Sequence, residues 1–88
     1  MAVRADVEGA IHLSGVCPVE DAEALLQLLI DRPGSTIDWR SCEEAHGAVV
    51  QVLLASSATM QGPPAGRFLQ RFVAPLLERA VGSEARSG

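Results

Sequence analysis

The sequence predicts a small α/β domain, with a mixed sheet of three to four strands packed against three helices. Apolar and polar residues alternate near the N-terminus and again around residue 37, as in half-exposed strands. Three longer segments repeat their apolar residues at helical spacing and follow the strands along the chain. A chain of 88 residues has the size of one domain. We place that domain at residues 1–81 and expect a disordered tail over 82–88.

The first third of the chain predicts a hairpin and a helix. Strands over 3–7 and 10–14 flank Glu8-Gly9, where glycine tolerates the positive φ of a tight turn, and Gly15 ends the second strand. A helix then opens at Cys17-Pro18, since proline suits the first helical position. Residues 31–34 end it. Its expected core stripe is Ala22, Leu25, Leu26, Leu29 and Ile30.

The middle of the chain predicts a third strand over 36–39, a polar turn over 40–44 and an apolar helix over 44–57. Ile37 and Trp39 point to one side of that strand. Because a helix connects strands 10–14 and 36–39, we expect these two strands to be parallel. The expected core stripe of the second helix is Ala45, Ala48, Val49, Val52, Leu53 and Ser56, with Val50 and Leu54 outside it.

The last part predicts a loop over 58–66 and a third helix over 67–81. The loop has room for a short strand at 59–61, which Pro63-Pro64 would confine to the sheet edge. Pro75 should kink the helix, because proline lacks the N–H of a regular turn. Its expected inward residues are Phe68, Leu69, Phe72, Val73, Leu76 and Leu77.

Composition argues against several function classes. A net charge of −4 is unsuited to a nucleic-acid surface, and three aromatic residues offer no base-stacking platform. The longest apolar run is far shorter than the roughly 20 residues that span a bilayer. The N-terminus lacks the apolar core of a signal peptide. We therefore expect a cytoplasmic protein without direct membrane insertion, whose two cysteines are free thiols.

Two segments resemble the STAS domain, the family of anti-sigma-factor antagonists. Residues 10–29, AIHLSGVCPVEDAEALLQLL, are similar to the family's second strand, glycine and first helix. Residues 36–54 are similar to its third strand, with Asp38 near the end, followed by its signature loop and second helix. The resemblance implies a STAS-like fold that docks a protein partner at the start of the second helix.

The chain departs from the family pattern at the phosphorylation site. That site is a Ser or Thr after an Asp, and the matching positions here are His46 and Gly47, followed by Ala48. Ser41 lies six residues too early. We therefore expect no phospho-acceptor at the usual position and no kinase-driven switch there.

The turn and the second helix form the predicted partner surface. Apolar area outside the core stripe, rimmed by charged residues, is typical of a docking site. The predicted partner-binding residues are Ser41, Cys42, Glu43, Glu44, His46, Gly47, Val50 and Leu54. The predicted function is a non-catalytic interaction module of a bacterial regulatory or scaffold assembly, without a cofactor. Its partner would be a kinase-like regulator, a scaffold, a transporter component or a second copy of the chain.

Other functions remain open at this point. Cys17, Cys42 and His46 could bind a soft metal or respond to redox state, although free cysteines are more often small buried residues. The chain could also be an accessory subunit of a membrane transporter. Enzymatic activity is not expected, because Cys42 and His46 lie too close along the chain to surround a substrate, and no phosphate-binding loop is present. Trp39 suits either the core or a contact surface.

Overall fold

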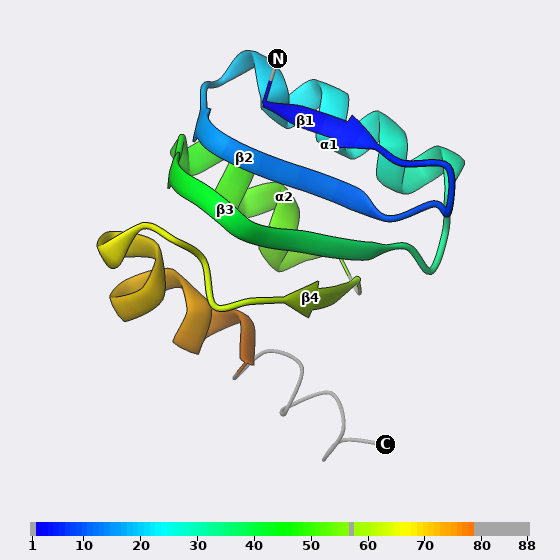
Figure 1. Ribbon diagram of the computed structural model, residues 1–88. Helices are drawn as coiled ribbons and strands as arrows, with labels where there is room; N and C mark the ends of the chain where they lie inside the picture. The colour runs from blue at the N-terminus through cyan, green and yellow to red at the C-terminus, as the bar shows by residue number, and fades with distance from the viewer. Residues whose placement is uncertain (1, 57, 79–88) are drawn as a thin grey trace.

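The computed structural model describes residues 2–56 and 58–78 and confirms the predicted α/β class (Figure 1). Four strands form one sheet in the order β1-β2-β3-β4. The last part of the predicted third helix and the predicted tail lie outside the described residues. The elements are β1 (Val3–Ala5), β2 (Ile11–Cys17), α1 (Glu20–Asp31), β3 (Thr36–Ala45), α2 (Gly47–Ala55), β4 (Thr59–Gln61) and the π-helical η1 (Leu69–Val73).

Strand pairing follows the sequence prediction. β1 and β2 form an antiparallel hairpin, and Gly9 occupies its turn with a φ of 92°. β2 and β3 are parallel and are connected through α1. β4 adds a second parallel pair on the far side of β3, so the sheet is mixed. The short strand predicted at 59–61 is thus confirmed at the sheet edge, before the two prolines.

The predicted end of β2 at Gly15 is wrong. Gly15 has a φ of 64° and lies within the strand, beside a register irregularity with β3. Such a bulge bends a strand without ending it. β2 therefore continues to Cys17, and α1 begins at Glu20 rather than at Cys17-Pro18.

The predicted polar turn over 40–44 is also wrong, because β3 continues through it to Ala45. Arg40 and Ser41 are both exposed, Cys42 is buried, and the next two residues are exposed again. These exposed pairs interrupt the strict alternation that marks a strand, so the pattern looked like a turn. α2 consequently begins at Gly47, three residues later than predicted.

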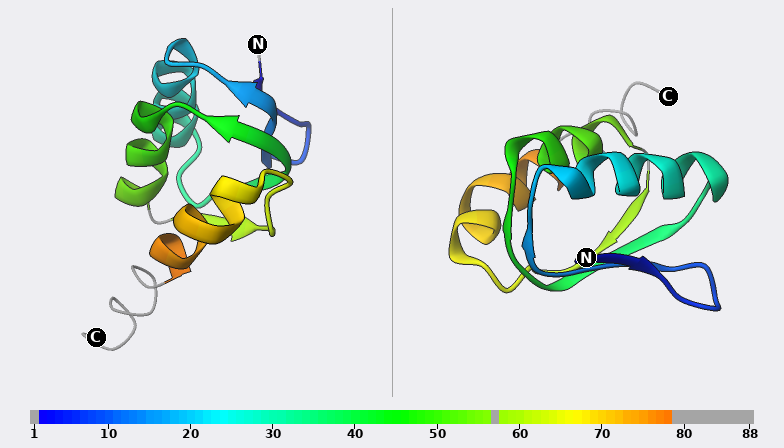
Figure 2. Two further views of the ribbon diagram at one scale, coloured as in Figure 1. Left: turned by 90° about the vertical axis from the view of Figure 1, so that its left-hand side faces the viewer. Right: turned by 90° about the horizontal axis from the view of Figure 1, so that it is seen from above.

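All three helices lie on one side of the sheet (Figure 2). Between the sheet and the helices lies a single buried cluster that includes Ile11, Leu25, Ile37 and Leu53. Trp39 belongs to it, so the core interpretation of this residue is confirmed. No helix among residues 2–56 and 58–78 is long and apolar enough to cross a membrane.

The third helix comprises residues 67–78, with η1 at its centre. The Ala74 N–H donates to the Leu69 carbonyl, five residues back, directly before Pro75. The helix thus contains a wide π-helical turn directly before Pro75, which is a common way to accommodate a disrupted helical ladder. At the helix start, the Gly66 N–H donates to the Cys42 carbonyl at 3.0 Å, which fixes the helix to the end of β3.

Five of the eleven apolar residues predicted to face inward from α1 and the third helix are exposed instead. In the third helix, Leu69, Val73 and Leu77 are buried, whereas Phe68, Phe72 and Leu76 are 66%, 54% and 46% exposed. In α1, Leu25 is buried, but Leu26 and Ile30 are 48% and 60% exposed. A helix on one face of a small sheet can bury only part of a wide apolar stripe, so the remainder faces solvent.

Candidate protein interaction surfaces

The carboxyl ends of β2 and β3 lie side by side and lead into α1 and α2. Val16 pairs with Glu44 and Cys17 with Ala45, and the His46 N–H donates to the Cys17 carbonyl at 2.9 Å. In open α/β sheets, this end of the parallel strands is the usual place for binding sites. Five exposed residues make up the strand-end surface: Val16, Val19, Glu44, His46 and Gly47.

Most of the predicted partner-binding residues reach the protein surface, but not in the predicted turn. Ser41, Glu43 and Glu44 are exposed on β3. Leu54 is exposed on α2, while Val50 is half-buried against the core. Cys42 is completely buried and cannot contact a partner, because its side chain points from β3 into the core. The prediction for Cys42 is therefore wrong.

His46 and Gly47 open α2 at this surface. His46 is the N-cap residue, and its Nδ1 accepts a hydrogen bond from the Ala48 N–H at 3.0 Å. This bond satisfies one of the N–H groups that a helix start leaves unpaired. Gly47 is exposed, and a Cβ added to it would meet nothing within 4 Å. The start of α2 can therefore accept a side chain or a partner without rearrangement.

The two thiols meet in the core, where the parallel strands β2 and β3 hold them side by side. The sulfur atoms of Cys17 and Cys42 are 3.9 Å apart, and both residues are fully buried. Hydrogen bonding to Cys17, together with burial, raises the pKa of the Cys42 thiol above its ordinary range. Since the thiolate is the nucleophile and the metal ligand, this environment suppresses both kinds of chemistry at Cys42, whereas the same hydrogen bond lowers the pKa of Cys17.

His46 does not join the cysteines. Its side chain is exposed and caps α2, whereas both sulfur atoms lie in the core. Within residues 2–56 and 58–78, no three His, Cys, Asp or Glu side chains gather in a way that could hold a metal ion. The three-ligand arrangement considered from the sequence is therefore not formed by these residues.

A charged network lies on the sheet face away from the helices. His12 Nε2 is 2.8 Å from Asp6 Oδ2, and its Nδ1 is 3.6 Å from Asp38 Oδ2. Arg40 donates from Nε and Nη2 to the two carboxylate oxygens of Asp38, at 3.0 and 2.8 Å. These bonds lower the pKa of Asp38 from 3.8 to about 2. The hydrogen bond with His12 likewise lowers the pKa of Asp6. Each of these four residues has a charged partner, so we interpret the network as part of a solvated sheet face.

An apolar groove of about 580 Å³ runs between α1 and α2, and we name it the α1–α2 groove. Its exposed walls come from the residues of α1 that the sequence assigned to the core. Glu23 stands at its edge and is the one charged residue among the described residues that line it. The main apolar lining residues are Ala22, Leu26, Leu29, Ile30, Ala48 and Val52.

The third helix carries a row of exposed apolar side chains, Phe68, Phe72 and Leu76, which we name the third-helix stripe. The residues are four apart, so they project from successive turns on one flank of the helix. The two phenyl rings pack with centroids 5.1 Å apart, and the Arg71 guanidinium lies 5.6 Å from the Phe72 ring centroid. The sequence pattern placed these three residues in the core, because periodicity cannot tell a buried apolar flank from an exposed one.

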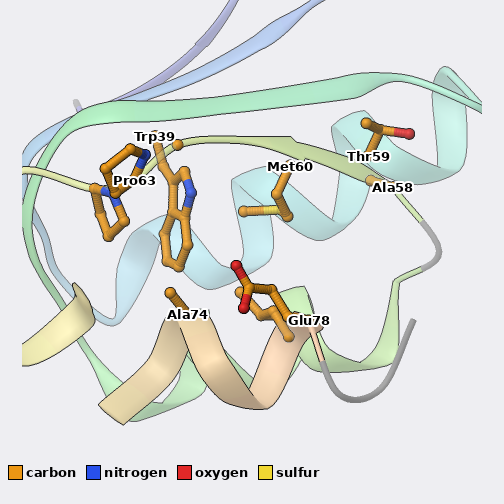
Figure 3. A pocket seen from close by; sticks show the side chains of 10 residues that line it. Trp39, Ala58, Thr59, Met60, Pro63, Ala74 and Glu78 are labelled. Atoms are coloured by element: carbon orange, nitrogen blue, oxygen red, sulfur yellow. The ribbon is translucent and has the colours of Figure 1, made fainter. Parts of the chain in front are cut away.

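A second concave feature, of about 650 Å³, lies between β4 and the third helix (Figure 3). Trp39 and Met60 reach into it from the strands, and Ala74 and Glu78 face them from the helix. The walls are apolar apart from a few polar groups such as the Glu78 carboxylate. No local sequence pattern predicts this cavity, because its lining residues come from three separate segments.

No protein family, no curated protein and no solved structure was found to match this chain. The arrangement of its own surfaces is therefore the basis for a functional assignment. Those surfaces offer two apolar areas on helices and one mixed area at the strand ends.

Proposed function

We propose that the chain is a non-catalytic protein–protein interaction module of a cytoplasmic bacterial regulatory or scaffold assembly. In this proposal it is similar to an anti-sigma-factor antagonist that lacks the phosphorylation switch. The observation that carries the proposal is the third-helix stripe. Phe68, Phe72 and Leu76 are each about half exposed or more, on a helix whose opposite side is anchored in the core.

Exposed aromatic residues in a contiguous row are unusual on a protein that functions alone. Burial of apolar surface is favourable by roughly 25 cal/mol for each Å² removed from water. Aromatic and arginine side chains are also the types enriched at the centres of protein interfaces. The stripe supplies the aromatic side chains, and Arg71 beside it lies over the ring of Phe72. A partner that covers this row would gain free energy from surface that is already ordered.

The strand-end surface supports the same function at the place where the resembled family docks its partners. The valines at positions 16 and 19 add exposed apolar area beside the start of α2. His46, Gly47 and Ala48 offer no hydroxyl there. Ser41 is exposed on β3, outside the helix start. A phosphate mapped to Ser41 in intact cells, with partner binding lost in Ser41→Asp, would contradict the absence of a switch.

The test is a capture experiment with three forms of the whole chain as bait in extract of the native cell. Phe72→Glu places a charge in the stripe. Val7→Glu is the matched control, because Val7 is fully exposed in the β1–β2 turn, away from the stripe. We expect wild type and Val7→Glu to retain the same protein, and Phe72→Glu to lose it. Identical capture by all three forms, or capture of no protein, would contradict the proposal.

A further inference from the structure

The third-helix stripe and the α1–α2 groove match in length. Phe68 and Leu76 are eight residues apart, as are Ala22 and Ile30 at the two ends of the α1 wall. At the α-helical rise of 1.5 Å per residue, the α1 wall is about 12 Å long, and the stripe is similar but somewhat shorter, because the π-helical η1 rises less per residue. One is a ridge of three side chains, and the other is an apolar trough between two helices. Insertion of an apolar helix flank into such a trough is a common mode of recognition.

Their charges are opposite. Arg67 and Arg71 flank the stripe, and within residues 2–56 and 58–78 neither forms a salt bridge. On the groove side, α1 carries acidic residues and no basic one, and Glu23 stands at the groove edge. α2, the other wall, has no charged residue. Pairing two stripes would bring arginines together, and pairing two grooves would bring Glu23 residues together. Charge complementarity favours a stripe in a groove.

The stripe cannot reach the groove of its own molecule. The third helix is fixed to β3 by the hydrogen bond from Gly66 to Cys42 and by its buried flank of Leu69, Val73 and Leu77. The groove lies between α1 and α2, and Leu29 and Val52 of its walls pack against the core. Both surfaces are therefore held in place and directed outward, so contact between them requires two molecules.

We propose that the third-helix stripe of one molecule docks in the α1–α2 groove of a second copy of this chain. The inference rests on the proposed function as an interaction module and names a partner for it. Each molecule would use two different surfaces, which makes the contact heterologous. Heterologous contacts build a ring if the rotation closes and an open chain if it does not.

The test uses purified protein and two variants that each disable one surface. Phe72→Glu disables the stripe and leaves the groove intact, whereas Ile30→Glu disables the groove and leaves the stripe intact. Both positions are more than half exposed, so both variants should fold, which a thermal melt checks. Val7→Glu is again the control. Sedimentation velocity over a wide range of concentrations measures the mass of each sample.

We expect wild type and Val7→Glu to form oligomers of increasing size as concentration rises. Phe72→Glu alone and Ile30→Glu alone should each associate roughly 30-fold more weakly or not at all, as for loss of an interface hot spot. An equal mixture of the two variants should form a heterodimer and stop there. The one intact stripe and the one intact groove contact each other in this pair, and the two surfaces left free are the disabled ones.

Other results would overturn the inference. Dimers of Ile30→Glu alone would mean that stripe pairs with stripe. Absence of the heterodimer in the mixture would mean that stripe and groove do not meet. A monomeric wild type that co-sediments with anionic phospholipid vesicles, while Phe72→Glu does not, would assign the stripe to a membrane surface. A monomeric wild type that still captures a different protein through Phe72 would exclude self-association and leave the proposed function standing.

Discussion

Asp38 illustrates how a single residue couples this fold to pH. Arg40 donates to it from the backbone N–H and from two side-chain nitrogens. The pKa of Asp38 falls to about 2 in the folded protein, below its ordinary value of 3.8. A carboxyl whose pKa is lowered by folding stabilises the protein above the unfolded pKa, and this stabilisation is lost as pH falls through the folded pKa. The window therefore runs from about pH 4 to about pH 2.

The corresponding prediction concerns Asp38→Asn. We expect wild type to be more stable than Asp38→Asn at neutral pH, and the difference in unfolding free energy to shrink as pH falls through this window. The effect should be small and should weaken with salt, because the Arg40 side chain is largely exposed. Denaturant titrations of both proteins at several pH values measure it. A difference that does not change with pH would show that this ion pair does not contribute as described.

Two glycines at helix starts should respond in opposite ways to alanine. A Cβ on Gly66 would overlap the Glu43 carbonyl oxygen, so the third helix would have to move away from β3. We expect Gly66→Ala to cost about 1–3 kcal/mol of stability, or more, as overpacking usually does. A Cβ on Gly47 meets open space, and Gly47→Ala should stabilise by up to about 1 kcal/mol. Urea denaturation of both variants tests the pair, and a neutral Gly66→Ala would refute the tight helix contact.

At the scale of elements, local sequence patterns predicted the type and order of the helices and strands well, but their lengths poorly. The hairpin, the parallel pairing of β2 with β3 and the edge strand β4 all follow from alternation, turn residues and connection length. The ends of β2 and β3 could not be predicted, because pairing between distant segments carries both strands past residues that look like stops. In β2 the apparent stop is Gly15, and in β3 it is the exposed pair Arg40-Ser41.

The candidate site was likewise predicted only in part from the sequence. The sequence predicted the parallel pairing of β2 with β3, and this pairing brings Cys17 and Cys42 together. It could not identify the third-helix stripe, since Phe68 and Leu69 differ in burial and not in hydropathic character. Which flank of a helix is covered depends on the area that the sheet offers, and this is a property of the whole fold.

The pairing of β2 with β3 leads to a prediction about the thiols. Cys17 and Cys42 are fully buried, and the pKa of Cys42 is raised. We expect a thiol reagent to modify native protein slowly, at a rate that follows unfolding, and denatured protein rapidly. Kinetics across a denaturant series measure this, with Cys17→Ser and Cys42→Ser separating the two sites. Rapid modification of native protein, or a disulfide isolated from cells, would support a redox function instead.

The two sides of the whole molecule differ in chemical character. Its helices cover one face of the sheet and carry both exposed apolar areas, the α1–α2 groove and the third-helix stripe (Figure 2). The opposite sheet face carries the charged network of Asp6, His12, Asp38 and Arg40. Burial of surface by a partner is favourable on the helical side, whereas on the sheet side it would remove paired charges from water. Partners should therefore approach from the helices or from the strand ends between them.

The strand-end surface provides the last prediction, which uses Gly47→Glu. Gly47 is the first residue of α2, and no acidic residue lies in the first turn of that helix. Replacement of glycine should improve helix propensity by about 0.5–1 kcal/mol, and an acid at the helix start should add a few tenths through the dipole. The folded state of Gly47→Glu should therefore be as stable as that of wild type or more stable. Binding of the partner captured by wild type should fall sharply, because the new charge would have to be desolvated within the contact.

The measurements are a thermal melt and a partner titration on the same variant, with Gly47→Ala as the matched control. Gly47→Ala has the same backbone effect without the charge, so it should melt like Gly47→Glu and bind like wild type. Unchanged affinity in Gly47→Glu, together with loss of binding in Phe72→Glu, would restrict the interface to the third helix. Loss of binding in both would extend it from the strand ends to the third helix. The hydrogen bond from Gly66 to the Cys42 carbonyl holds these two surfaces on one rigid body, so a single partner could span both.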